Sequence, residues 1–378
     1  MNKNIKLAVA GAVLALSATA ANAGIVIPAG DWTVDINGNV NTFSTYTRHT
    51  GDATIAGGYA GFVSGANDTG SKTGNNITTG LLPNYLGVTG TTRQNDLDVS
   101  FTISINPGSS VTQSGGQSAK QENRQAFLTF GDKSWGSVKV GKDLGIFASD
   151  AILNDMTLLG VGGGAGALAG NTTTLGRIGT GFIYADWKSQ LAYTTPNMSG
   201  FQATFGLTQA FNARASSYGT ETYATDSSGF VEEVGLTAVS ATSTGRANGQ
   251  SAYEAKASYS FAANDVTGKV WVSGISQKAR SIATSVDQNV TSADIGANIN
   301  LAGFGLTGYY YSGRGIGTTM QLLDGFDTAG NRRDSDGGYV QATYVLPTKT
   351  KLGVSWGRSN LDKTSSDSDT NLVKENEM

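Results

Sequence analysis

Apolar and polar residues alternate with a period of two over long stretches of this chain. In the segment 201–207 the odd positions are apolar, and glutamine, threonine and glycine separate them. The same alternation recurs over 253–261, 294–301 and 351–356. Because successive side chains of a β-strand point to opposite faces, these segments are predicted to be strands with one apolar and one polar face.

Such segments repeat along the chain, and the connections between them differ in length. Short connections such as 196–200 and 347–350 alternate with long polar ones, of which 47–82 and 212–250 are examples. A fourteenth strand is predicted to begin near Asn371. The thirteen strands before it are predicted at 31–45, 82–90, 96–106, 123–131, 136–142, 187–196, 200–211, 251–262, 267–278, 292–302, 304–313, 338–347 and 350–361.

Two folds fit this pattern: a soluble sandwich with the apolar face as its core, and a barrel with the apolar face toward lipid. The polar face carries charges and glycines, with no predicted helices to cover it. Aromatic residues near strand ends, at 309–311, Trp32, Trp271 and Trp356, fit the interfacial girdles of membrane barrels. A closed barrel pairs every backbone N–H and C=O within the hydrocarbon. We therefore predict an all-β fold, a transmembrane antiparallel β-barrel.

The first 23 residues are predicted to be a signal peptide. Lys3 and Lys6 precede an apolar stretch at 7–16, and Ala21-Asn22-Ala23 forms a small-residue cleavage site. The stretch is too short to span a membrane, and no later segment has 18 consecutive apolar residues. We therefore expect an exported chain in which one barrel domain covers 24–378.

Composition narrows the possible chemistry. The chain has no cysteine and one histidine, so disulfides and clusters of cysteine and histidine around a metal are excluded. Without Lys3 and Lys6, 26 − 2 = 24 basic residues face 29 acidic ones. A net negative charge argues against a nucleic-acid partner, which requires a basic surface. We expect no cofactor and no metal.

Three segments carry a family resemblance. Residues 123–127 resemble an Arg-x-Ala-aromatic strand, and 135–142 resemble a G-x-x-x-x-G-R strand with Lys142 in place of the arginine. Residues 179–205 are similar to the strand and hairpin that follow a constriction loop. On these motifs the chain resembles the general diffusion porins of Gram-negative outer membranes. The resemblance implies a 16-stranded barrel, a homotrimer in outer-membrane lipid, and a third outer loop, here up to about Leu159, that folds inward.

The resemblance also implies a constriction in which acidic loop residues face basic residues of the wall. It places Asp155 at an acidic loop position, and Leu159 where a glutamate is common. Arg124 and Arg177 match two wall arginines, and Tyr85 stands at the position of a third. Because two charged positions are neutral here, we expect a weaker transverse field than in the family.

Four other charged residues are candidates for the same constriction. Lys139 and Lys142 are expected to replace part of the positive wall, and Asp143 and Asp150 to add to the charge of the loop. Charges that line a narrow aqueous pore act at close range, so their sign and arrangement bias which ions pass.

These expectations lead to an outer-membrane channel for passive diffusion of small hydrophilic solutes and ions. The alternative is a solute-selective channel of similar build that prefers anions. A barrel enzyme ranks third, since the lone His49 has no recognisable serine motif beside it. An adhesive or structural barrel, suggested by the long polar loops, ranks fourth.

The C-terminal segment leads to two further expectations. The chain ends Lys-Glu-Asn-Glu-Met, whereas the porins that it resembles end in a strand with a terminal aromatic residue. We expect that about 30–50 residues are missing at the C-terminus, at ~10 residues per strand. Asp367 and Asp369 imitate the start of a calcium loop, but Leu372 and Met378 replace its glycine and glutamate. A dedicated calcium site is not expected, and weak divalent binding there is left open.

Overall fold

The computed structural model describes residues 24–48, 73–109, 121–162, 173–211, 221–225, 231–236, 245–247, 250–281, 286–327, 329–367 and 374–377. The predicted signal peptide, His49 and Asp369 lie outside these residues. The elements are β1 (Ile25–Ala29), β2 (Trp32–Asn39), β3 (Phe43–Arg48), β4 (Thr73–Thr78), β5 (Tyr85–Gln94), β6 (Leu97–Ile105), β7 (Ala126–Asp132), β8 (Gly136–Leu144), α2 (Ser149–Asn154), β9 (Trp187–Thr194), β10 (Phe201–Thr208), β11 (Glu221–Thr225), β12 (Val231–Leu236), β13 (Gly245–Ala247), β14 (Ala252–Ala263), β15 (Val266–Ser281), β16 (Asp287–Leu301), β17 (Phe304–Arg314), β18 (Asp334–Val345), β19 (Lys351–Leu361) and β20 (Lys374–Glu377).

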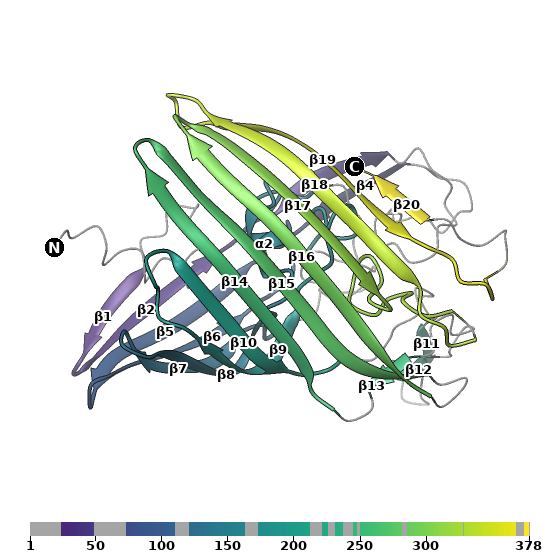
Figure 1. Ribbon diagram of the computed structural model, residues 1–378, viewed down its shortest axis with the longest axis horizontal. Coiled ribbons are helices and arrows are strands. Elements are labelled where there is room, and N and C mark those ends of the chain that lie inside the picture. Colours follow the sequence, from purple (N-terminus) through teal and green to yellow (C-terminus); the bar gives the residue numbers. More distant parts are fainter. Residues whose placement is uncertain are drawn as a thin grey trace.

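One antiparallel sheet contains sixteen of the described strands. Its order is β1-β2-β5-β6-β7-β8-β9-β10-β14-β15-β16-β17-β18-β19-β20, and β13 pairs with β15. The pairs β3–β4 and β11–β12 form two separate small sheets. Figure 1 shows the large sheet curving around α2. The predicted all-β antiparallel fold is confirmed, and each of the fourteen predicted strand positions corresponds to a strand of this sheet.

The predicted alternation of short and long connections is also confirmed. The turn between β5 and β6 consists of Asn95 and Asp96, both with positive φ (49° and 61°). This geometry is that of a type I′ hairpin turn, whose twist matches the flanking strands. The hairpins β14–β15 and β16–β17 close as tightly. At the opposite end of the strands, the long connections hold β3, β4, α2 and β11 to β13.

The strand register shows which face of the sheet is apolar. Leu128, Val140 and Leu191 form one row across β7, β8 and β9, and their side chains are 41%, 44% and 51% exposed. The neighbouring row, on the other face, contains Thr129 and Lys139. Exposed apolar rows and a polar inner face are the arrangement of a membrane barrel and the reverse of a soluble sandwich.

The buried apolar core lies inside the curved sheet. The described parts of two loops, 145–186 and 315–333, and the inner face of β15 to β18 supply most of it, and Leu81 adds to it from the connection before β5. Its large members are Phe147, Ile178, Phe182, Ile183, Trp271, Tyr309, Tyr311, Ile316, Leu322, Phe326 and Tyr339. The inner wall on this side therefore carries a packed core and is not bare to water.

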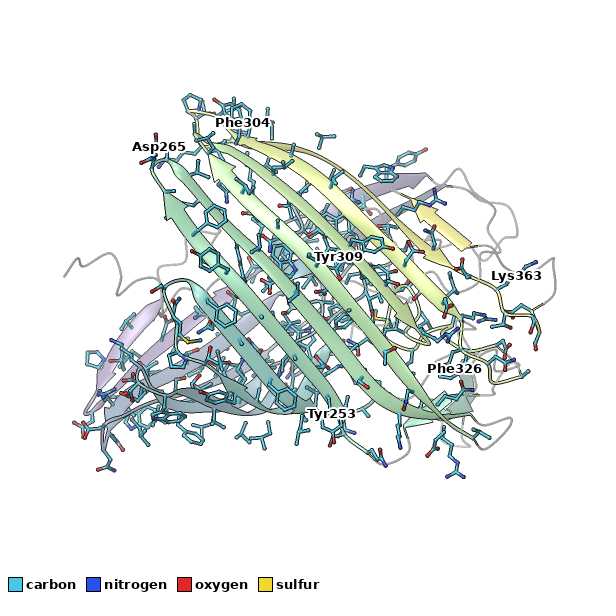
Figure 2. The ribbon with its side chains drawn as sticks, viewed as in Figure 1. Tyr253, Asp265, Phe304, Tyr309, Phe326 and Lys363 are labelled. Carbon is cyan, nitrogen blue, oxygen red and sulfur yellow. The ribbon has the colours of Figure 1, made fainter. Side chains whose placement is uncertain are left out.

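This core corrects the expected position of some aromatic residues. Trp271, Tyr309 and Tyr311 are buried on the inner face, so they do not belong to a lipid girdle. Figure 2 shows Tyr309 near the middle of the wall, whereas Tyr253 and Phe304 lie toward opposite ends of the wall. Because the side chains of Tyr253 and Phe304 are exposed, they fit interfacial positions.

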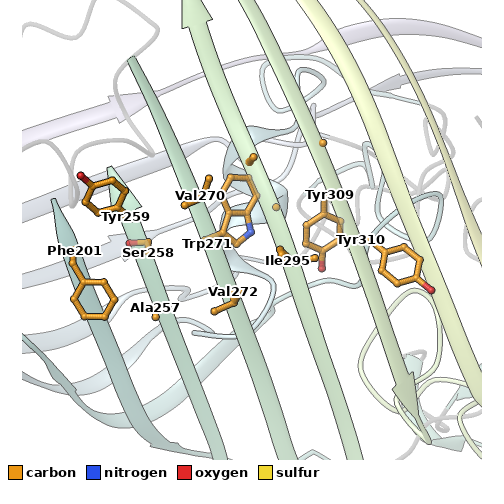
Figure 3. A pocket seen from close by; sticks show the side chains of 13 residues that line it. Phe201, Ala257, Ser258, Tyr259, Val270, Trp271, Val272, Ile295, Tyr309 and Tyr310 are labelled. Carbon is orange, nitrogen blue, oxygen red and sulfur yellow. The ribbon is translucent and has the colours of Figure 1, made fainter. Parts of the chain in front are cut away.

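The outer face of β14 to β17 carries a shallow apolar hollow. Small residues, among them Ala257, Ala297 and Gly308, line its floor, and Phe201, Tyr259 and Tyr310 stand around it (Figure 3). Its volume is about 550 Å³. Because Phe201, Tyr259 and Tyr310 lie on the apolar outer face, the hollow lies outside the path expected for hydrophilic solutes.

Two strand predictions differ from the structure. β1 was not expected, because its apolar residues 25–27 do not alternate; it forms a hairpin with β2 through Gly30, whose φ is 65°. The predicted strand 31–45 ends at Asn39. There Asn41 donates to the carbonyl of Leu82 at 2.9 Å and turns the chain away from β2. Among the described residues, no helix has the length and apolarity needed to cross a membrane.

Candidate pore constriction

The connection between β8 and β9 spans residues 145–186, and its described parts, 145–162 and 173–186, fold against the inner face of the sheet. Its two ends lie side by side, since the amide of Gly145 donates to the carbonyl of Asp186 at 2.7 Å. A Cβ at position 145 would lie 2.3 Å from the carbonyl oxygen of Ala185. Glycine therefore allows the two arms of the loop to leave the wall together.

A buried carboxylate on β14 holds the outgoing arm. Both oxygens of Glu254 are used: Oε2 accepts from the amides of Ile146 and Phe147, each at 2.8 Å. Its Oε1 accepts from Thr208 at 2.8 Å and forms an ion pair with Lys188. Both side chains of this ion pair are fully buried. Because an unpaired buried charge is costly, this cluster fixes where the loop enters the lumen.

The helical turn α2 is attached to the same wall through Asp150. Its carboxylate forms ion pairs with Lys256 of β14, at 3.0 Å, and with Lys269 of β15. The carbonyl of Ala151 accepts a hydrogen bond from the hydroxyl of Tyr339 at 2.8 Å. Burial alone would raise the pKa of Asp150, but the two lysine charges outweigh it and lower this pKa. Asp150 is therefore an ionised link between loop and wall.

At the end of α2, Asp155 organises the loop itself. It accepts from the amide and hydroxyl of Thr157, both at 2.8 Å, and from the amide of Arg177 at 3.3 Å. Burial raises the pKa of Asp155, although these partners oppose the shift. Gln341 of β18 bonds both sides of this turn, at the carbonyl of Asn154 (2.5 Å) and the amide of Met156 (3.0 Å).

Arg177 lies in the returning arm, next to Asp155. Its side chain is almost fully buried and donates to the carbonyl of Thr180 at 3.4 Å. A Cβ at Gly357 of β19 would lie 2.6 Å from this guanidinium. The structure therefore brings Asp155 and Arg177 together against one wall, whereas the resemblance implied that they face each other across the pore.

The predicted lysines of β8 lie on opposite faces of the sheet. Lys139 is on the inner face, where it pairs with Asp143 and lies 4.8 Å from the ring centre of Phe127. Lys142 pairs in register with Ala126 and Ser189. These two residues lie on the outer face of the sheet, so Lys142 lies there as well. Asp143, expected in the loop, is a wall residue at the end of β8. Because Lys142 is on the outer face, it is not part of the proposed constriction.

The three remaining candidates lie on three different segments. Arg124 precedes β7, donates to Glu122 at 2.9 Å and lies 5.8 Å from the ring centre of Trp187. Tyr85 opens β5 with a buried hydroxyl group, and Leu159 is half exposed on the loop. The role of all the candidate residues in selectivity stays a prediction.

Sequence reasoning missed the wall residues that hold the loop: Lys188, Glu254, Lys256, Lys269 and Gln341. A signal was present, because Glu254 and Lys256 occupy the polar positions of an alternating strand. Their parity predicts that they face inward. It does not identify their partners, which are more than a hundred residues away for Ile146 and Asp150.

A curved antiparallel sheet with an apolar outer face, a polar inner face and a loop folded against its inner wall defines a transmembrane β-barrel channel. The family model of the Gram-negative porins matches residues 8–374. The chain belongs to this family. The protein is thus an outer-membrane porin, a channel through which small solutes diffuse passively.

Solved structures support the fold. An anion-selective porin from Comamonas acidovorans is 15% identical, with 87% of this chain and 79% of that chain covered and a TM-score of 0.53. The outer membrane channel DcaP of Acinetobacter baumannii is 16% identical (89% and 80% covered, TM-score 0.56). OmpF of Salmonella typhi is 13% identical (90% and 83% covered, TM-score 0.51). A comparison with curated protein sequences finds no match.

Proposed function

We propose that the loop 145–186 forms the constriction of a general diffusion channel for small hydrophilic solutes and ions, with weak charge selectivity. The observation that carries this proposal is the attachment of the loop to one wall by bonds to its outgoing arm, to α2 and to the turn at Asp155. A fixed obstruction narrows the lumen without closing it.

Weak selectivity follows from the pairing of the charges near the loop. Asp150 is met by Lys256 and Lys269, and Asp143 is met by Lys139. Some other inner-wall contacts are between hydroxyl groups, such as Thr194 with Thr204 at 3.0 Å. Paired charges and hydroxyls create a weaker field across a pore than separated rows of acids and bases.

A second candidate is a channel that prefers anions. Lys256 and Lys269 meet a single aspartate of the loop, and both lysine side chains are partly exposed. One structure of similar fold is described as an anion-selective porin. We further propose that residues 1–23 are removed on export, that the barrel domain covers 24–378 and acts as a homotrimer in lipid, and that the protein has no enzymatic activity.

The reversal potential of the purified full-length chain in a planar bilayer, under a potassium chloride gradient, tests this function. We expect a small reversal potential and a current that grows linearly with solute concentration. A large potential of anion-selective sign, or a current that saturates with one solute, would favour the selective channel. A chain that folds and inserts but conducts no current contradicts both.

A further inference from the structure

A second loop folds into the same interior, and no sequence motif marks it. Residues 315–333, described except for 328, connect β17 to β18. Ile316, Thr319, Leu322, Phe326 and Asp327 are each 0% exposed. Figure 2 shows Phe326 near the end of the strands where the long connections gather. A loop of this kind is packed into the core of the lumen and is not a free surface loop.

This second loop contacts the returning arm of the constriction loop. The carbonyl of Thr319 accepts from the amide of Tyr184 at 2.8 Å. The side-chain amide nitrogen of Gln321 donates to the carbonyls of Tyr184 and Ala185, at 3.2 and 3.1 Å. A Cβ built on Gly179 would lie 2.5 Å from Thr319 Oγ1, so the two loops also touch there.

Gln321 also joins this contact to the buried ion pair of the wall. Its side-chain oxygen accepts from Lys188 at 2.6 Å, and Lys188 pairs with Glu254. Gln321 is itself almost fully buried. Gln321 thus bonds the returning arm, and Lys188 connects it to Glu254, which bonds the outgoing arm.

The far end of the second loop is fixed by the connection after β19. Arg333 donates to both carboxylate oxygens of Asp367, at 2.9 and 2.7 Å, and to the carbonyls of Asp324 and Phe326. The Arg333 guanidinium holds the pKa of Asp367 below its ordinary value. Asp367 therefore serves this ion pair, which leaves little capacity for the divalent binding considered above.

We propose that the loop 315–333 is a brace for the constriction, and that Gln321 is the positioning residue through which it acts. The proposal rests on the constriction role of the loop 145–186. Without Gln321, two buried carbonyls of the returning arm lose their donor, and a buried acceptor or donor without a partner is unfavourable. The arm then takes up other positions, and the aperture fluctuates.

Single-channel recording of full-length Gln321→Ala tests the brace. We expect open-channel current noise to rise several-fold and subconductance states to appear, with the circular dichroism and heat-modifiable migration of the folded barrel unchanged. Arg314→Ala is the matched control, because Arg314 forms an exposed pair with Asp334 at the two strand ends that flank this loop. A folded Gln321→Ala channel with the noise of the native protein overturns the proposal.

A second measurement applies if Gln321→Ala does not insert. The native chain has no cysteine, so Gly179→Cys with Thr319→Cys creates a single possible disulfide. A Cβ at Gly179 would lie 3.2 Å from that of Thr319, slightly inside the usual disulfide spacing. Gly179 has a φ of 83°, a backbone conformation that is strained for cysteine, so heat-modifiable migration first establishes that the double variant folds. We expect oxidation to link the loops and to lower channel noise relative to the reduced form. In a folded double variant, equal noise in the linked and reduced forms overturns the brace.

The two proposals fail in different ways. If Asp150→Asn changes ion selectivity while Gln321→Ala leaves the current unchanged, the constriction stands and the brace is wrong. If neither variant changes conductance, noise or selectivity in a folded channel, the constriction role of the loop 145–186 is wrong as well.

Discussion

At the scale of single residues, the charges of the lumen act mainly in pairs. Asp150 is the clearest case, since Lys256 and Lys269 both bind it. Its acid is buried while the lysines are partly exposed, so a permeating ion meets the cations more directly than the anion. The balance of charge in this triad, Asp150 with Lys256 and Lys269, therefore sets the local charge of the constriction.

We expect Asp150→Asn to make the channel more selective for anions. The change leaves two lysine charges uncompensated, and one unit charge at about 4 Å is worth about 1 kcal/mol in water, which limits the change in permeability ratio to about fivefold. Reversal potentials in a salt gradient measure it. Asp98→Asn, at an exposed pair with Arg93, is the control. An unchanged ratio would mean that the triad lies outside the ion path.

A pH dependence follows from the same residue. The pKa of Asp150 in the folded protein lies below the ordinary value of 3.8. A lowered pKa gives a stabilising contribution that is present above 3.8 and is lost as the pH falls through the folded pKa. We expect the native channel to gain anion selectivity only below about pH 3.8, and Asp150→Asn to lack this step. A step near neutral pH in the native channel contradicts the assignment.

At the scale of elements, the wall strands and the inward loops depend on each other. The amides at the start of the loop have Glu254 as their acceptor, and Glu254 has Lys188 as its counter-charge. Because the cluster is buried, breaking one partner leaves the other charge unpaired. The loop is therefore part of the folded wall rather than an appendage to it.

We expect Glu254→Gln to destabilise the folded chain by about 3–5 kcal/mol, since it leaves Lys188 buried without its counter-ion. The double variant Glu254→Gln with Lys188→Met should be less destabilised than the single variant, because the lone charge is gone. Urea unfolding from lipid vesicles measures both. If the double variant lost as much stability as the single variant, or more, the unpaired Lys188 charge would not be the cause of the destabilisation.

At the scale of the whole molecule, the sheet presents an apolar face to lipid and a polar face to the lumen. The two faces alternate residue by residue, as Leu128 and Thr129 of β7 show. A charged substitution that is tolerated at a lumen-facing position is therefore expected to destabilise the barrel at the neighbouring lipid-facing position.

We expect Leu128→Arg to lower folding stability in vesicles by up to about 2–4 kcal/mol, the cost of an arginine facing the hydrocarbon midplane. Thr129→Arg is the matched comparison and should insert nearly as well as the native chain, because its side chain points to the lumen. Folded fractions from heat-modifiable gel migration distinguish the two. Equal effects would mean that the outer face has been assigned to the wrong row.

Alternation along the sequence determined the strands, their faces and the antiparallel fold of this protein, because strand geometry makes neighbouring side chains point to opposite sides. It also placed Glu254 and Lys256 on the polar face. It failed for β1, which has no alternation. The place of Trp271 and Tyr309 near strand ends predicted a lipid girdle, whereas both rings face inward.

Only the tertiary structure decided which charges meet. Asp155 and Arg177 lie together on one wall, Asp150 binds lysines more than a hundred residues away, and the loop 315–333 supports the constriction. No local pattern in the sequence predicts these contacts, because they form where loops fold across the curved sheet. The sequence alone specifies a membrane channel, and the long-range packing inside it specifies how that channel is narrowed.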